Sequence, residues 1–272
     1  MRYNSALCFL PCLLLPCWLS GCLIPEGTTP VARINTQFAS QYNHRGMVEN
    51  ERGVWQSELR TDLADRFGGA VQFGAWGNLD LGDSVGDAWF PKGHGGKFTE
   101  VDLTAAYARQ VGGFDLRGGV ISYVLPDGSE FPNGVRGTTT EVFGVVGHEI
   151  PFGLYPSFRA DIDWDEVDGY YLNTAIERAL ALPPIDPVRA LVKLSLGYSD
   201  DNHSDWTYGL DESGFSDLRA AGTLFYDYNA NTTFSLGLAA STILDDDLRD
   251  WFELIDISPD NVWITTGVGF TF

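Results

Sequence analysis

The side chains that could do chemistry in this chain are four cysteines, four histidines and 37 carboxylates. The cysteines are Cys8, Cys12, Cys17 and Cys22, so no thiol follows residue 22. This excludes a disulfide scaffold, a cysteine-ligated metal site and a cysteine nucleophile in the rest of the chain. The formal net charge of −20 argues against a nucleic-acid partner, because such a partner needs a basic face.

The histidines and carboxylates do not form a recognisable catalytic or metal-binding pattern. His203 stands next to Ser204 and Asp205, but a catalytic triad is assembled across a fold and not from adjacent residues. Asp163 and Asp165 could form a protease-like acid pair, yet such pairs are common in so acidic a chain. We therefore expect no enzyme, no metal and no cofactor.

The first 22 residues predict a lipoprotein-type secretory signal. One positive charge, Arg2, precedes an apolar stretch over 6–19 that is too short to span a bilayer comfortably. Residues 19–22 read LSGC, which resembles a bacterial lipobox. This implies removal of residues 1–21, acylation of Cys22 and a linker over 22–31. The alternative is a retained anchor helix, which its length and two internal prolines disfavour.

Beyond the linker, the sequence alternates between polar and apolar residues in segments of about ten residues, the period of a β-strand. No helical period of any length interrupts them. Twelve such segments predict an all-β fold, and they fall at 32–43, 54–65, 69–81, 97–109, 113–125, 138–149, 154–164, 169–180, 189–199, 216–227, 232–243 and 261–272.

The lengths of the connections indicate a transmembrane barrel. Short, glycine- and asparagine-rich turns alternate with longer links, as in outer-membrane barrels with short periplasmic turns and long external loops. A soluble barrel of twelve strands would also enclose more space than side chains can fill. The predicted external loops are 44–53, 82–96, 126–137, 165–168, 200–215 and 244–260, of which only 165–168 is short.

Aromatic residues gather at both ends of the apolar faces, as in the two interfacial girdles of a membrane barrel. The long-loop girdle comprises Tyr42, Trp55, Trp164, Tyr170 and Tyr198, and the short-turn girdle comprises Phe67, Tyr107, Phe114, Phe152, Tyr226, Tyr228 and Phe234. The chain ends on Phe272 after an alternating strand, which resembles the signal read by the outer-membrane assembly machinery. We predict an antiparallel transmembrane β-barrel over 32–272 with both termini in the periplasm. The alternative is a soluble β-sandwich on a lipid anchor.

Four short segments carry a family resemblance: Ala39–Gly46, Gly74–Asn78, Glu100–Leu103 and Asp168–Tyr171. Together they resemble the TorF family of porins, over most of 36–272. The resemblance implies a small outer-membrane barrel and supplies no catalytic residues. The lipobox and the enlarged acidic loops at 200–215 and 244–260 depart from the family pattern.

The polar face of the predicted strands would line a lumen. Twelve strands tilted by about 40° close at a Cα radius of about 12 Å, which leaves a narrow water path. Either this mixed-charge wall is wetted, or its charges pair across strands and plug the lumen. The pore-lining candidates are Arg33, Glu58, Arg60, Asp62, Glu100, Asp102, Arg117, Glu141, Arg159, Asp161, Glu177, Lys193 and Arg219.

The predicted external loops hold most of the excess negative charge. They would form an acidic vestibule that concentrates cations. Within it, Asp245, Asp246 and Asp247 could bind Ca²⁺ or share divalent cations with lipopolysaccharide, although they lack the ligand spacing of a known calcium loop. The alternative is a solvated surface that prevents aggregation. The vestibule candidates are Asp200, Asp201, Asp205, Asp245, Asp246 and Asp247.

These observations predict a bacterial outer-membrane channel for passive diffusion of ions or small solutes, with a preference for cations. The expected partners are outer-membrane lipid and lipopolysaccharide, the assembly machinery and the solutes themselves. The rival function is a non-conducting structural or adhesive lipoprotein.

Overall fold

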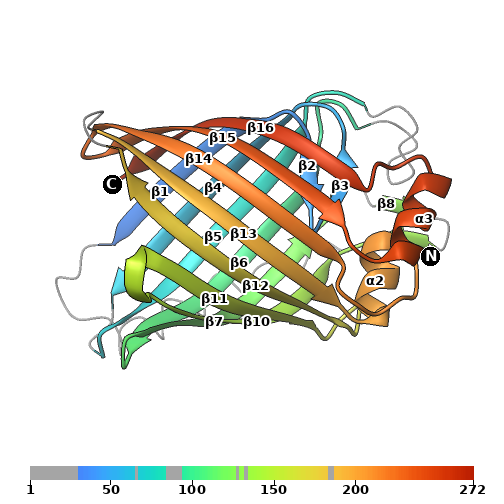
Figure 1. Ribbon diagram of the computed structural model, residues 1–272, viewed down its shortest axis with the longest axis horizontal. Coiled ribbons are helices and arrows are strands. Elements are labelled where there is room, and N and C mark those ends of the chain that lie inside the picture. The colour runs from blue at the N-terminus through green and yellow to red at the C-terminus, as the bar shows by residue number, and fades with distance from the viewer. Residues whose placement is uncertain (1–29, 65–66, 84–93, 127–128, 132–133, 183–186) are drawn as a thin grey trace, which may run out of the picture.

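The computed structural model describes residues 30–64, 67–83, 94–126, 129–131, 134–182 and 187–272. Twelve antiparallel strands form one closed barrel, in which the last strand pairs with the first (Figure 1). This confirms the predicted fold. The barrel strands are β1 (Val31–Ala39), β4 (Val54–Ala64), β5 (Gly69–Asp80), β6 (Phe98–Val111), β7 (Phe114–Val124), β10 (Thr139–His148), β11 (Leu154–Asp163), β12 (Tyr170–Ala181), β13 (Val188–Ser199), β14 (Asp217–Asn229), β15 (Thr232–Ile243) and β16 (Asp260–Thr271).

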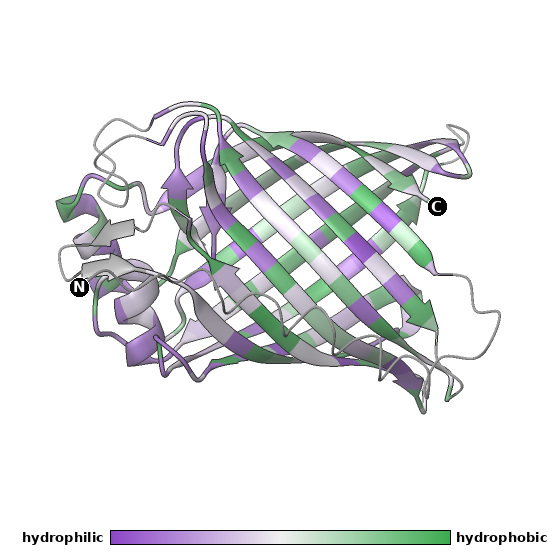
Figure 2. Cartoon of the chain, turned by 180° about the vertical axis from the view of Figure 1, so that it is seen from behind, coloured by the Kyte–Doolittle hydropathy of each residue, from purple (hydrophilic) through white to green (hydrophobic). Residues whose placement is uncertain are grey.

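The apolar face of the barrel points outward. Leu59, Leu236 and Ile264 each expose half or more of their surface, whereas the alternating polar residues Gln56 and Asn78 are buried inside. Figure 2 shows this alternation of hydropathy along the strands. An apolar exterior around a polar interior is the arrangement of a membrane barrel and the reverse of a soluble one. Among the described residues, no helix is long and apolar enough to cross a membrane.

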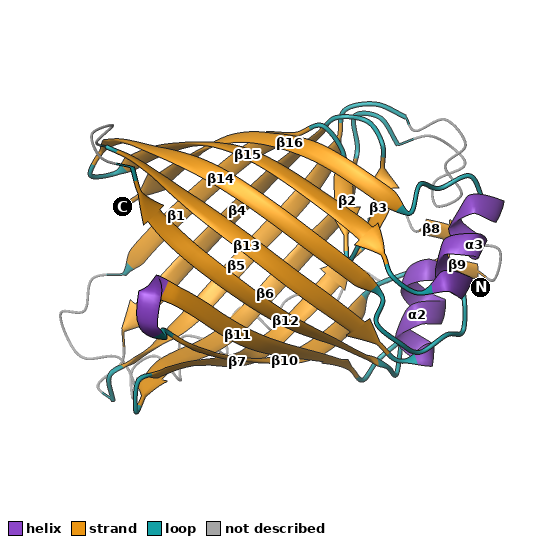
Figure 3. Cartoon of the chain, viewed as in Figure 1, coloured by secondary structure: helices purple, strands orange, loops and turns teal. Residues whose placement is uncertain are grey.

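The two ends of the barrel differ, as the connection lengths predicted. One end, here called the turn end, carries tight connections such as Gly112–Gly113 and the 3₁₀ turn η1 (Pro151–Gly153). The other, the loop end, carries two short hairpins and two helices (Figure 3). The hairpins are β2 (Tyr42–His44) with β3 (Met47–Asn50), and β8 (Ser129–Phe131) with β9 (Gly134–Arg136); the helices are α2 (Asp201–Tyr208) and α3 (Asp246–Leu254).

The two helices correct the expectation that the chain has no helical segment. Each begins at a carboxylate cap: Asp200 accepts from the His203 amide (3.0 Å), and Asp245 accepts from the Leu248 amide (3.1 Å). In α3, Leu248 and Phe252 lie four residues apart and are both buried. Eight and nine residues are too few for a helical period to stand out within an acidic loop.

The barrel closes next to the end of the chain. Phe272 and Ala32 exchange two backbone hydrogen bonds (2.9 and 3.3 Å), and the Phe272 side chain is exposed at the turn end. The predicted signal over 1–21, Cys22 and most of the linker lie outside the described residues. Lipidation of Cys22 therefore stays a prediction.

Candidate functional site: the barrel lumen and its plug hairpin

The segment between β1 and β4 forms a hairpin, β2 and β3, which we call the plug hairpin (residues 42–50). Its two-residue turn, Arg45-Gly46, has positive φ at both positions (47° and 86°), the conformation of a type I′ turn. From the sequence, residues 44–53 are predicted to form an external loop, and Tyr42 is predicted to belong to the outer aromatic girdle. Both predictions are wrong, because β1 ends at Ala39 and Tyr42 is buried inside the barrel.

The plug hairpin crosses the lumen at the loop end. The Tyr42 hydroxyl donates to the Glu100 carboxylate on β6 (2.6 Å). Asn43 donates from Nδ2 to the Ser241 hydroxyl on β15 (3.1 Å). Arg45 reaches Glu141 on β10. In the closed barrel β6 and β10 are separated only by β7, whereas β15 lies across the barrel from both, so the hairpin spans the opening instead of standing above it.

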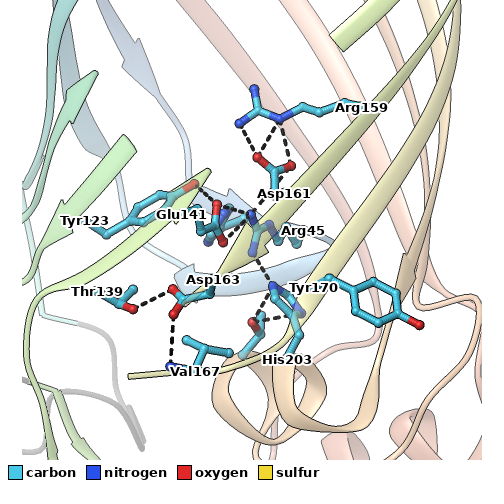
Figure 4. Close-up of polar contacts among 12 residues, drawn as sticks. Arg45, Tyr123, Thr139, Glu141, Arg159, Asp161, Asp163, Val167, Tyr170 and His203 are labelled. Atoms are coloured by element: carbon cyan, nitrogen blue, oxygen red, sulfur yellow. Dashed lines mark hydrogen bonds and ion pairs between the residues drawn. The ribbon is translucent and has the colours of Figure 1, made fainter. Parts of the chain in front are cut away.

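Arg45 occupies a cage of acidic and aromatic side chains (Figure 4). Its Nη2 donates to both oxygens of Glu141 (2.9 and 3.0 Å) and lies 4.0 Å from Asp161 Oδ2. Its guanidinium carbon lies 4.6 Å from the centre of the Tyr171 ring, within cation–π range. Its Nη1 contacts His203. The Arg45 side chain is 10% exposed and the Glu141 side chain 3%, so the ion pair is nearly removed from water.

The two carboxylates of the cage have further partners that hold them in place. The Tyr123 hydroxyl donates to Glu141 Oε2 (2.8 Å), and Arg159 donates through Nε to both oxygens of Asp161 (2.9 and 2.7 Å). Burial by itself would lower the pKa of Arg45, but Glu141, Tyr123, Asp161 and Tyr171 together outweigh it and leave that pKa well above its usual value. Arg45 is therefore a permanent cation in this site.

Packing contacts also hold the tip of the plug hairpin in place, in addition to the Arg45–Glu141 ion pair. A Cβ atom on Gly46 would lie 2.5 Å from the Cβ of Asp217 on β14, so only glycine fits both the space and the positive φ there. The Tyr208 hydroxyl of α2 donates to the Arg45 carbonyl (2.8 Å). Met47 is buried in a cluster with residues of α2, α3 and β15, namely Tyr208, Ile243, Leu248 and Phe252.

Empty space remains in the lumen on the turn-end side of the hairpin. A cavity of about 530 Å³ is lined by hairpin residues and by wall residues such as Asp102, Arg219 and Trp263. A second cavity of about 460 Å³ lies against Asn35 and Phe225. The two cavities adjoin, because Gln37, Gln56, Trp76, Thr223 and Thr265 line both.

The structure places the pore-lining candidates on the inward face. Glu58, Glu100, Asp102, Arg159, Asp161 and Arg219 line the two large cavities, and Glu141 lines a cavity of about 70 Å³ between the hairpin and α2. The others pair along the wall. Asp62 binds both Arg33 and Arg60, and Lys193 Nζ lies 2.7 Å from Glu177. Arg117 donates to Gln72 instead (2.9 Å).

The wall charges are distributed unevenly along the barrel. The carboxylates near the loop ends of the strands include five that are here called the acidic collar: Glu100, Asp102, Glu141, Asp161 and Asp217. The wall cations in that half are Arg159 and Arg219, joined by Arg45 of the hairpin. Towards the turn end, acids and bases are balanced, as in the Arg33–Asp62 and Arg189–Asp227 pairs. The hairpin therefore inserts its cation into the acidic half.

The vestibule candidates do not converge on one site. Asp200 and Asp245 cap the two helices, while Asp201, Asp246 and Asp247 are exposed in the first helical turns and Asp205 is exposed further along α2. Within the described part of the chain, no group of three or more His, Cys, Asp or Glu side chains could hold a metal ion.

The sequence analysis missed Arg45, Tyr123 and Tyr171 as members of the site. Both tyrosines share the inward phase of residues that it did select, because Tyr123 follows Arg117 by six residues and Tyr171 precedes Glu177 by six. The alternation could therefore have found them. Arg45 had only the weak signal of a possible Arg-Gly turn, and strand periodicity carries no information about a loop that folds inward.

No protein-family profile and no curated protein matches this chain. Solved structures resemble its fold. The COG4313 outer membrane channel from Pseudomonas putida F1 has a TM-score of 0.55 at 10% identity, over 92% of this chain and 97% of that one. The NanC porin has a TM-score of 0.52 at 9% identity, over 88% and 100%. The chain thus shares its architecture with bacterial outer-membrane barrels, and its resemblance to the TorF family stays a prediction.

Proposed function

We propose that this chain forms a bacterial outer-membrane channel for the passive diffusion of ions or small solutes. The observation that carries the proposal is the unfilled polar lumen: cavities of about 530 and 460 Å³ adjoin inside a barrel whose exterior is apolar. Wall charges pair with neighbours on the same or the next strand and so leave this space empty. The resemblance to the TorF porins supports the same function.

The channel prefers cations over anions. The acidic collar lies at the outer half of the lumen, and further exposed carboxylates lie above it on α2 and α3. A cleft lined by one sign of charge concentrates the opposite ion, most strongly when little salt is present to screen it. The solutes that fit are small cations and hydrated neutral molecules.

The plug hairpin favours a second candidate, a non-conducting structural or adhesive barrel. It crosses the loop end of the lumen and is tied to β6, β10 and β15 by hydrogen bonds of 2.6–3.1 Å. A permanent plug would confine the function to the external surface, where the acidic helices could bind cations, lipopolysaccharide or another cell.

Recording from planar bilayers separates the two candidates. We expect discrete conductance steps, and under a KCl gradient a reversal potential displaced towards that of K⁺. Neutralising the α3 acids, as in Asp246→Asn with Asp247→Asn, should reduce this preference at low salt and leave it unchanged at high salt. Silence of both the wild-type chain and a chain without the plug hairpin would establish the structural barrel.

Anchoring is a separate part of the proposal. The lipobox supports an acyl chain on Cys22, and the terminal Phe272 supports recognition by the assembly machinery. Replacement of Cys22 by serine should abolish labelling with radioactive palmitate, while the barrel itself still requires detergent for extraction. Labelling that persists in the serine variant would overturn the lipobox assignment.

A further inference from the structure

The cage around Arg45 has the composition of a receptor for a guanidinium group. We propose that a guanidinium-bearing solute competes with Arg45 for this cage and thereby releases the plug hairpin, so that the channel is opened by the class of cation it binds. The inference rests on the proposed function for its gating part, whereas its binding part can be tested without any conductance.

The geometry selects a planar cation. One guanidinium nitrogen of Arg45, Nη2, donates to both Glu141 oxygens, the other, Nη1, contacts His203, and the Tyr171 ring faces the guanidinium carbon at 4.6 Å. An ammonium group has one nitrogen and no flat face, so it cannot contact Glu141 and His203 through two nitrogens and lie flat against a ring at the same time. Tyr123 and Arg159 hold the two carboxylates from behind, so the cage is preorganised whichever guanidinium fills it.

A solute in the lumen can reach this cage. Arg45, Asp161 and Tyr171 all line the cavity of about 530 Å³ on the turn-end side, and Arg45 with Glu141 also lines the small cavity towards α2. The cage is therefore a boundary between two spaces and not a sealed core. Arg45 also adopts a left-handed backbone (φ 47°), which the type I′ turn of the hairpin requires and which places its side chain at the hairpin tip.

Arg45 is tethered next to the cage, whereas the solute is free. Their competition sets the solute concentration that is needed to release the hairpin. A short tether presents its group at an effective concentration in the millimolar range. A free guanidinium compound should therefore displace Arg45 only at millimolar concentrations, and it should bind more tightly once Arg45 is removed. An ion pair with a purely structural role would not show this tighter binding after Arg45 is removed.

The binding test uses agmatine, which carries a guanidinium, and putrescine, its diamine counterpart without one. Calorimetry on detergent-folded Arg45→Ala should show agmatine binding at least tenfold tighter than to the wild type, with putrescine far weaker. Arg45→Ala combined with Glu141→Gln should lose the site, and Arg249→Ala, outside the lumen on α3, should behave as the wild type. Equal agmatine affinities for wild type and Arg45→Ala would overturn the cage.

The gating test uses the same compounds in planar bilayers. Millimolar agmatine should raise the open probability of the wild type, putrescine should not, and Arg45→Ala should be open without either. A chain that never conducts but shows the binding pattern would refute the channel and keep the cage. A conducting channel that agmatine does not open would refute the gate.

A conservative variant protects the test against misfolding. Arg45→Lys keeps the charge but lacks the flat guanidinium and its second nitrogen. It should fold, as judged by heat-dependent gel mobility. It should open at lower agmatine concentrations than the wild type. An unchanged agmatine response in Arg45→Lys would contradict a cage that selects for guanidinium.

Discussion

The two halves of the lumen differ in charge and in what fills them. At the loop end, the acidic collar faces inward and a segment of the chain itself crosses the opening with one buried cation. Towards the turn end, acids and bases alternate on neighbouring strands, pair along the wall and leave a cavity of about 460 Å³. Like charges gathered on one ring need a mobile counter-charge, whereas paired charges neutralise each other in place.

This difference teaches that occlusion and wall charge are separate properties of the barrel. One of the two alternatives drawn from the sequence is a lumen plugged by paired wall charges. In the structure those pairs lie flat along the wall, and the obstruction is the plug hairpin. We therefore expect mutations of the hairpin to change occlusion, and mutations of wall acids that do not contact the hairpin to change ion preference.

Removal of the plug hairpin should have the largest effect. Ala39 and Val54 are register partners on β1 and β4, so a two-residue Asn-Gly turn can replace residues 40–53 without disturbing the barrel. The side chains of the wall alone would then limit the water path at the loop end, to a width of about 10 Å or less. Conductance in planar bilayers should rise severalfold; a value equal to that of the wild type would mean that the hairpin does not limit flow.

Breaking one ion pair in each half should come next. Glu141→Gln leaves Arg45 buried without its main partner, which costs about 3–5 kcal/mol of hairpin docking. Glu177→Gln breaks a half-exposed pair with Lys193 and should cost at most about 1 kcal/mol. The readout is the rate of tryptic cleavage after Arg45 in the detergent-folded protein. Equal rates in the two variants would contradict the idea that the Arg45–Glu141 ion pair holds the hairpin in place.

Neutralisation of wall acids in the hairpin-deleted background should change selectivity in one half only. Glu100→Gln with Asp102→Asn removes two neighbouring carboxylates from the collar, so the K⁺/Cl⁻ permeability ratio should fall by roughly two- to threefold. Asp115→Asn at the turn end, where acids and bases are balanced, serves as the matched control. A fall of the same size there would show that the acidic half does not set the preference.

Acidification should have the smallest effect. Burial, and then the charge of Arg45, lower the pKa of His44, although Glu100, Glu141 and Asp161 oppose this shift. The docked hairpin therefore binds fewer protons than the released one, whose histidine has a pKa of about 6.5. Docking is strongest above that pH and weakens as the pH falls below it.

The measurement for this prediction is tryptic cleavage after Arg45 at pH 7.5 and at pH 5.5. Cleavage should be a few-fold faster at the lower pH, after correction for the activity of trypsin. His44→Gln should reduce the difference, and His148→Gln at the turn end should leave it unchanged. A His44→Gln variant with the full pH response would assign that response to the carboxylates instead.

Much of the barrel could be predicted from the sequence. All twelve strands lie within a few residues of their predicted ranges, because a strand with one face in lipid and one in water has to alternate at every second position. The same alternation placed Glu58, Asp102 and Arg219 on the lumen side, where they line cavities. The connections were less predictable, since helices of eight and nine residues and a hairpin of nine leave no long period.

The sequence by itself determined the strand number of the wall, its inward and outward faces, and the acidity of the loops at one end. Those features are local or periodic, so they can be read along the chain. Only the tertiary structure decided where the plug hairpin lies, because Arg45 and Glu141 are 96 residues apart and meet only once the barrel has closed. The cage and the obstruction arise from long-range contacts, which periodicity does not encode.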